Sequence, residues 1–131
     1  MRLDIGLLLA RLAFGGSMLF NHGLGKLMSF KGMAATFPDP IGLGSKVTLC
    51  VAIFCEVFCA ALVVIGLSTR LATLPLIGTM LVAFFIVHAA DPWTARELAF
   101  MYGVGFAVIF CTGPGAFSAD GFLRLKRTSR P

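Results

Sequence analysis

Four long apolar segments constrain this chain more than any other feature of its sequence. They cover residues 5–20, 47–67, 71–90 and 98–113. Each is about 16 to 21 residues long, close to the roughly 20 that a helix needs to cross a 30 Å hydrocarbon core. The whole chain is 58% hydrophobic and 13% charged, whereas soluble domains average about 45–50% and 25%. Membrane barrels show short alternating runs instead. The sequence therefore predicts an all-α fold, an integral membrane four-helix bundle.

We expect one transmembrane domain over residues 1–131. Its predicted parts are helices at about 5–21, 47–67, 71–90 and 97–113, and an interfacial loop at 22–46. Arg2 precedes the first apolar segment, as in a secretory signal, but Arg11 interrupts that segment and no clean small-residue cleavage site follows. We therefore expect the N-terminal segment to stay attached as the first helix.

Basic residues predict the orientation. With four spans, the termini and the second loop share one side, which carries Arg2, Arg70, Arg124, Lys126, Arg127 and Arg130. The other side carries Lys26, Lys31, Lys46 and Arg96. Because basic residues favour the cytoplasmic side, both termini should be cytoplasmic. The net charge of +5 is then a membrane-surface feature, as anionic lipid attracts each Lys or Arg by about 1 kcal/mol. The tail is too short, and too poor in interleaved aromatics, to predict nucleic-acid binding.

Two histidines mark a polar rim at the outer end of the bundle. His22 and His88 end two helices that both run outward, so they should lie at one level. The other members of the predicted rim are Lys26, Asp91, Trp93, Arg96, Glu97 and Tyr102. Trp93 and Tyr102 are candidate ligand contacts, although aromatic residues at this depth more often anchor a helix in the interface. The histidines could equally be interfacial residues that hydrogen-bond to a loop.

Two charged residues lie deeper in the apolar segments. Counted from the segment ends at about 1.5 Å per residue, Arg11 and Glu56 differ in level by only about 6 Å. An isolated charge at this depth costs at least about 2.5–3.5 kcal/mol, so we expect the two to face each other as a pair. Such a pair is either a functional site or a staple between helices.

The four cysteines predict packing rather than redox chemistry. Cys50, Cys55, Cys59 and Cys111 contain no C-x-x-C motif. Thiols within lipid ionise poorly and are therefore poor nucleophiles. We expect no metal site.

Three strings together resemble the DoxX family of small membrane proteins. They are "LLLARLAFGGSMLFNHGLGKL", "GLSTRLATLPLIGTMLVAFFIVH" and "GPGAFSADGFL", and the resemblance extends over roughly residues 7–123. It implies a multi-pass four-helix bundle in the cytoplasmic (inner) membrane of a bacterium. Some members are similar to the DoxD component of thiosulfate:quinone oxidoreductase, and others are linked to membrane oxidoreductase assemblies that handle thiol and oxidative stress. It also implies a polar pocket, since Arg11, His22, Lys26, Glu56 and His88 stand at family-like positions.

Three functions remain open. In the first, the protein is a membrane subunit of a quinone- or thiol-linked oxidoreductase, and it binds a small redox ligand or partner in an outward-facing pocket. The candidate catalytic residues are then Glu56, His22 and His88. The candidate ligand contacts are Arg11, Lys26, Tyr102 and Trp93. The candidate aromatic walls of the pocket are Phe54, Phe58, Phe84, Phe85 and Phe106. A quinone fits this set best. Haem between His22 and His88 is disfavoured, because both lie near the rim.

The second function is a non-catalytic assembly or anchor subunit of a larger membrane complex. The third is a small proton-coupled transporter that uses Glu56. The predicted pairing with Arg11 argues against this function, because the arginine would already neutralise the carboxylate. In each case we expect the lipid bilayer, and membrane protein partners or further copies of the chain, as the surroundings.

Overall fold

The computed structural model describes residues 1–129, in which every regular element is a helix. Four of its helical stretches are long and apolar enough to cross a membrane: Arg2–Met28, Ser45–Ile65, Thr69–Val87 and Trp93–Thr112. The predicted all-α fold with four candidate spans is confirmed. Arg130, counted above among the basic residues, lies outside the described residues.

The first span is longer than the sequence predicted. It runs without a break through α1 (Arg2–Ala10), the wide π-type turns η1 (Arg11–Gly15) and η2 (Met18–Gly23), and α2 (Leu24–Met28). The predicted loop at 22–46 is therefore helical at its start, and His22 and Lys26 lie on the span itself. A short helix, α3 (Phe30–Met33), follows.

The remaining spans lie close to their predicted positions. The second comprises α4 (Ser45–Ile53), η3 (Phe54–Cys59) and α5 (Ala60–Ile65); the third comprises α6 (Thr69–Val82) and η4 (Ala83–Val87); the fourth is α7 (Trp93–Thr112). Glycines end the second and fourth spans, as the motifs "GLSTR" and "GPG" indicate. Gly66 and Gly113 have φ angles of 78° and 80°, which a residue with a side chain rarely adopts.

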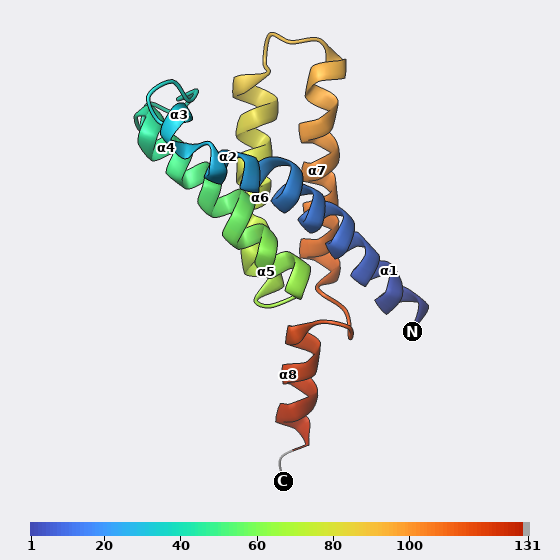
Figure 1. Ribbon diagram of the computed structural model, residues 1–131. Helices are drawn as coiled ribbons and strands as arrows, with labels where there is room; N and C mark the ends of the chain where they lie inside the picture. The colour runs from blue at the N-terminus through green and yellow to red at the C-terminus, as the bar shows by residue number, and fades with distance from the viewer. Residues whose placement is uncertain (130–131) are drawn as a thin grey trace.

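Figure 1 shows α6 and α7 side by side, with the first two spans crossing in front of them. The buried core between the spans includes Met18, Val63, Leu76, Phe106 and Ile109. Many other large apolar side chains face outward, as expected for a surface that contacts lipid.

Glycines bring the first span close to its neighbours. A Cβ at Gly15 would lie 3.3 Å from the Ala60 carbonyl oxygen, and one at Gly23 would lie 2.6 Å from the Glu56 carbonyl carbon. A Cβ at Gly105 on α7 would overlap the Phe14 ring. Close helix approach at small residues is typical of membrane bundles, where packing replaces the hydrophobic effect between helices.

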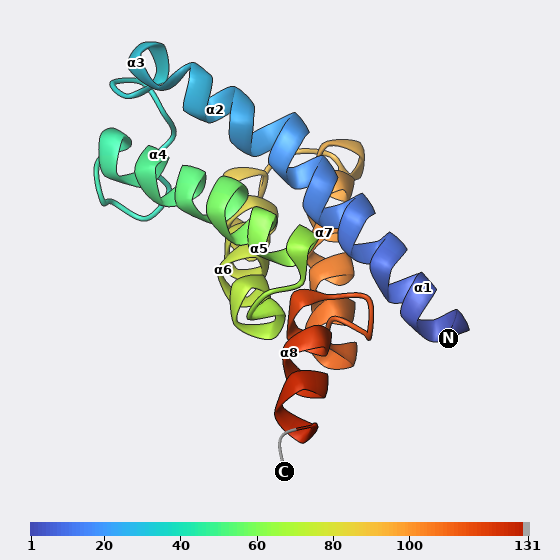
Figure 2. The ribbon, with the colours of Figure 1, turned by 60° about the horizontal axis from the view of Figure 1, so that its bottom comes forward.

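An additional helix, α8 (Ala119–Thr128), extends beyond the bundle, as Figures 1 and 2 show. It begins at Ser118, whose hydroxyl accepts a hydrogen bond from the Gly121 N–H at 3.0 Å. This helix was not predicted from the sequence. The start of α1 and helix α8 lie at the same end of the bundle, which is the arrangement that four spans require.

Candidate functional site

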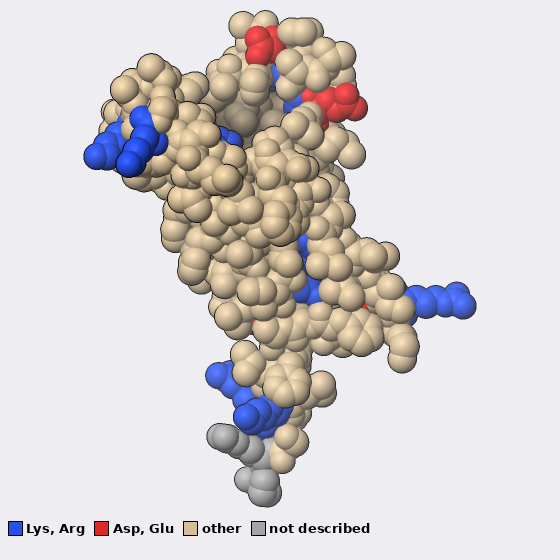
Figure 3. All heavy atoms as spheres, viewed as in Figure 1, with Lys and Arg blue, Asp and Glu red and all other residues tan. Residues whose placement is uncertain are grey.

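A polar cavity of about 190 Å³ lies near the ends of α2 and η4. Five of the predicted site residues line it: His22, Lys26, Glu56, His88 and Tyr102. Apolar side chains, including those of Met18, Met80 and Ala99, complete its wall. We call this cavity the outer pocket, after the outward side predicted from the sequence. Figure 3 shows the surface hollowed between the α3–α4 region and the adjacent end of the α6–α7 pair.

Glu56 forms an ion pair with Lys26, not with Arg11. Lys26 Nζ lies 2.6 Å from Glu56 Oε2, and the two side chains are 21% and 7% exposed. The predicted Arg11–Glu56 pair is wrong. Gly23 makes the observed pair possible, because it brings the first span against the backbone of Glu56, and Lys26 lies one helical turn further along.

Arg11 lies at the opposite end of the bundle and is 1% exposed. Its guanidinium donates to the Val64 carbonyl oxygen at 2.9 Å and to the carbonyl oxygen of Phe117. The prediction failed because it measured depth from the ends of the apolar segments, whereas the first span extends past both ends. Glu56 is level with Gly23, which lies 12 residues, or about 18 Å, along the helix from Arg11.

The two histidines approach the outer pocket from different spans. His22 packs edge-on against Tyr102, with ring centroids 5.4 Å apart. His88 Nδ1 lies 2.7 Å from Asp91 Oδ2, so Nδ1 can donate a hydrogen bond to this carboxylate. The other ring nitrogen, Nε2, then remains available to contact a ligand. The pocket thus brings together two imidazoles, a phenol and an ion pair.

Trp93 is not part of the outer pocket. It is 53% exposed, and its ring lies 6.1 Å from that of Phe84 and 5.4 Å from that of Phe100. Arg96, another predicted rim residue, stacks on Phe84 at 4.1 Å and donates to its carbonyl oxygen. These contacts form an aromatic cluster near the start of α7, which fits an interfacial anchor.

Wide π-type turns carry three of the predicted site residues, and a fourth directly follows one. Arg11 lies in η1, His22 in η2 and Glu56 in η3, while His88 directly follows η4. Such turns are rare in proteins and often occur at functional sites, because the extra residue redirects a side chain from its regular position. Predictions from regular helical spacing do not reveal such turns.

An apolar groove of about 340 Å³ adjoins the outer pocket between α6 and α7. Met80 and Ala99 line both. Of the predicted aromatic walls, Phe84 and Phe85 line this groove. Phe106 is fully buried in the core instead. Phe54 and Phe58 stack on each other at 5.3 Å and line a separate apolar depression.

Other chemistries have less support in the described part of the chain. Within residues 1–129, no three His, Cys, Asp or Glu side chains are placed to hold a metal ion. All four cysteines are free, and Cys55 and Cys59 are buried.

The comparisons with known proteins give one match. A family model described as DoxX matches residues 6–89, which cover nearly all of the first three spans and include His22, Lys26, Glu56 and His88. No curated protein and no solved structure matches the chain.

Proposed function

The chain belongs to the DoxX family, and from this premise we propose that it is the ligand-binding membrane subunit of a quinone-linked redox system. The outer pocket receives the polar head of the ligand, and the groove between α6 and α7 receives an apolar tail. We place the protein in the inner membrane of a bacterium, with its termini in the cytoplasm and the outer pocket on the opposite side.

The adjacency of a polar pocket and an apolar groove carries this proposal. The two cavities share the lining residues Met80 and Ala99, and we infer that one molecule with a polar head and a lipid-soluble tail occupies both. Ligand sites combine mostly apolar walls with a few polar groups that fix orientation. A membrane quinone has this combination, since its ring carries two carbonyl acceptors and its tail is a hydrocarbon.

The polar groups of the pocket suit a ligand that gains or loses protons. Conversion of a quinone to a quinol takes two electrons, which a redox partner would supply, and two protons. Tyr102 and the histidines can donate hydrogen bonds to carbonyl oxygens, and Lys26 can stabilise negative charge on one of them. An imidazole ring has one nitrogen that can donate and one that can accept a hydrogen bond, so a histidine can relay a proton.

The Lys26–Glu56 pair couples ligand charge to the packing of the pocket. While Lys26 faces Glu56, each charge compensates the other. If Lys26 turned toward a negatively charged oxygen of the ligand, Glu56 would lose its partner in an apolar region, which is costly for a charged side chain. Ligand binding at Lys26 and the integrity of the ion pair are therefore linked in this proposal.

The test is ligand content and ligand response of the protein purified from native membranes. Wild type should carry extractable quinone and should unfold at a higher temperature when a short-chain quinone is added. His22→Ala and Lys26→Met should lose most of that response. Phe20→Ala is the matched control, because Phe20 is an exposed aromatic residue near His22 on η2 and lines neither the outer pocket nor the groove. Its response should match that of wild type.

A different result would favour an assembly or anchor subunit. If wild type carries no quinone and all variants respond alike, the redox proposal fails. Co-purified membrane proteins would then identify the complex that the chain supports. A transporter that uses Glu56 would instead require a cationic substrate to displace Lys26, and proton-coupled uptake into vesicles measures that activity directly.

A further inference from the structure

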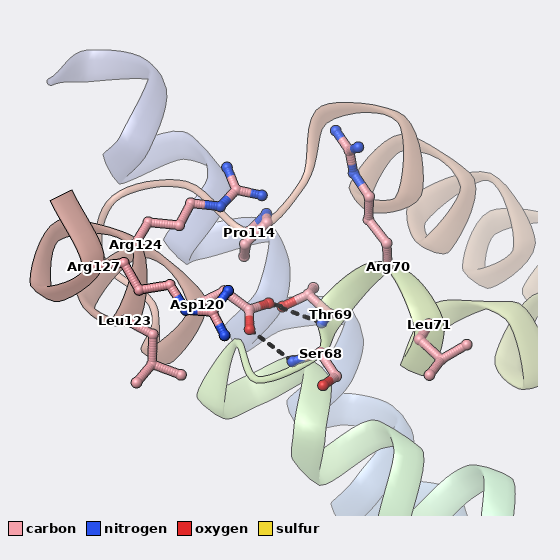
Figure 4. A pocket seen from close by; sticks show the side chains of 9 residues that line it. All are labelled: Ser68, Thr69, Arg70, Leu71, Pro114, Asp120, Leu123, Arg124 and Arg127. Carbon is pink, nitrogen blue, oxygen red and sulfur yellow. Dashed lines mark hydrogen bonds between the residues drawn. The ribbon is translucent and has the colours of Figure 1, made fainter.

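A second polar cavity, of about 430 Å³, lies at the opposite end of the bundle from the outer pocket. The turn before α6, the segment after α7 and helix α8 enclose it. Its lining residues are Ser68, Thr69, Arg70, Leu71, Pro114, Asp120, Leu123, Arg124 and Arg127. Figure 4 shows Arg124 and Arg127 extending from α8 near Pro114 and Asp120, and Arg70 extending from the start of α6 along the segment after α7. We call this cavity the arginine cavity.

Asp120 holds the walls of the arginine cavity together. Its carboxylate accepts hydrogen bonds from the Ser68 N–H at 2.8 Å, the Thr69 N–H at 3.0 Å and the Thr69 hydroxyl at 3.0 Å. Its own N–H donates to the Gly66 carbonyl oxygen at 2.9 Å. The turn before α6 is thereby fixed to the start of α8, and the carboxylate is largely occupied by these donors.

The three arginines remain available to a ligand. Among residues 1–129, none of the three forms an ion pair with an acidic side chain. Arg70 donates to the Cys111 carbonyl oxygen at 3.3 Å, and Arg124 and Arg127 lie one turn apart on α8. Three arginines and one aspartate give the arginine cavity a net charge of +2.

We propose that the arginine cavity binds the phosphate group of an anionic phospholipid. Guanidinium groups bind phosphate oxygens through paired hydrogen bonds, which favours phosphate over other anions of similar charge. The arginine cavity also lies where phospholipid phosphates are expected, because Thr69 begins the third span and Thr112 ends the fourth.

Apolar side chains beside the arginines favour a lipid over a free ion. Leu71 and Leu123 line the arginine cavity and are 70% and 47% exposed. On α8, Phe122 and Leu125 are 67% and 66% exposed, next to the basic residues. Exposed apolar residues mixed with Lys and Arg are typical of helices that contact the membrane interface.

The test compares lipids of different charge bound to the full chain in detergent. Short-chain phosphatidylglycerol should stabilise the protein against heat and remain bound in native mass spectrometry, whereas phosphatidylcholine should do so weakly. The Arg124→Gln, Arg127→Gln double variant should bind phosphatidylglycerol about 25-fold more weakly, since one basic residue near an anionic headgroup contributes about five-fold. Both residues are exposed on α8, so the fold should persist.

The matched control is the Arg2→Gln, Lys126→Gln double variant, which removes the same charge from residues outside the arginine cavity lining. It should bind phosphatidylglycerol like wild type. Equal losses in both double variants, or no loss in either, would overturn the proposal, because binding would then depend on overall charge. Inorganic phosphate is the third probe. If it stabilises wild type as well as the lipid does, and only the arginine cavity variant loses the effect, the phosphate site is supported and the lipid source is overturned.

Discussion

Lys26 and Glu56 form a 2.6 Å ion pair across the first two spans, at the outer pocket. Glu56 is 7% exposed and Lys26 is 21% exposed, so the carboxylate has little access to water. In such surroundings a charge is tolerated mainly because its partner is present. The pair therefore links the packing of the two spans to the chemistry of the pocket.

Loss of Lys26 alone should destabilise the protein more than loss of both partners. Lys26→Met leaves Glu56 unpaired and should lower the free energy of unfolding by about 3 kcal/mol. The Lys26→Met, Glu56→Gln double variant should recover at least about 1 kcal/mol of that loss. Unfolding in detergent, followed by circular dichroism, measures both values. Additive losses in the double variant would contradict the coupling.

Arg11 should act independently of Glu56. Arg11→Gln removes charged hydrogen bonds to Val64 and Phe117 and should cost about 2–3 kcal/mol of unfolding free energy. Because the two sites lie at different levels, Arg11→Gln and Glu56→Gln should add to within about 0.5 kcal/mol. The same unfolding assay on the double variant checks this. A clear departure from additivity would restore the direct coupling that the sequence analysis expected.

The sequence alone predicts the four spans and groups most of the polar residues that line the outer pocket. Apolar runs reveal membrane helices strongly, because few soluble structures tolerate them, and the first and third helices run in the same direction, which places His22 and His88 at the same end of the bundle. Lys26 was correctly grouped with them, although it was assigned to a loop. Tyr102 was grouped correctly by its distance from the start of the fourth span.

Which charged residues pair across neighbouring spans could not be predicted from the sequence in the same way. Helix ends, and therefore depths, follow from the apolar run only to within a turn or more. Where two helices meet depends on small residues such as Gly23, whose close approach to Glu56 decides which cation reaches the carboxylate. Helix α8 was missed because it is short and alternates basic with apolar residues, so its sequence lacks the long apolar run that marks a span.

Gly23 should tolerate no side chain. A Cβ at this position would lie 2.6 Å from the Glu56 carbonyl carbon, so Gly23→Ala should push the first two spans apart and cost about 1–3 kcal/mol. Gly25 is the matched control, since no atom lies within 4 Å of a Cβ placed there. Gly25→Ala should leave the unfolding temperature unchanged or raise it. Equal effects of the two substitutions would contradict the close approach.

We predict that the α2–α3 side of the protein faces outward and that the termini face the cytoplasm. In a variant with Cys50 and Cys111 replaced by serine, Lys31→Cys should react with a membrane-impermeant thiol reagent in intact cells. Ser129→Cys should react only after the cells are permeabilised. The physical basis is the excess of basic residues around α8, which favours retention on the cytoplasmic side. The reverse labelling pattern would invert this orientation.

Asp120 should give the protein an acid-sensitive link between α8 and the turn before α6. Burial by itself would raise the pKa of Asp120, but the hydrogen bonds from Thr69 and Ser68 outweigh it and hold the pKa below the ordinary value of 3.8. A lowered folded-state pKa stabilises the fold above the unfolded-state pKa, and this stabilisation is lost as the pH falls through the folded-state value. Wild type should therefore keep a constant contribution from Asp120 above about pH 5 and lose it progressively below about pH 4.

Asp120→Asn should be less stable at neutral pH, and its unfolding temperature should change less between pH 5 and pH 3. Glu97→Gln, which alters an exposed carboxylate, should keep the wild-type pH dependence. Identical pH profiles for wild type and Asp120→Asn would show that the hydrogen bonds of Asp120 do not stabilise its charged form.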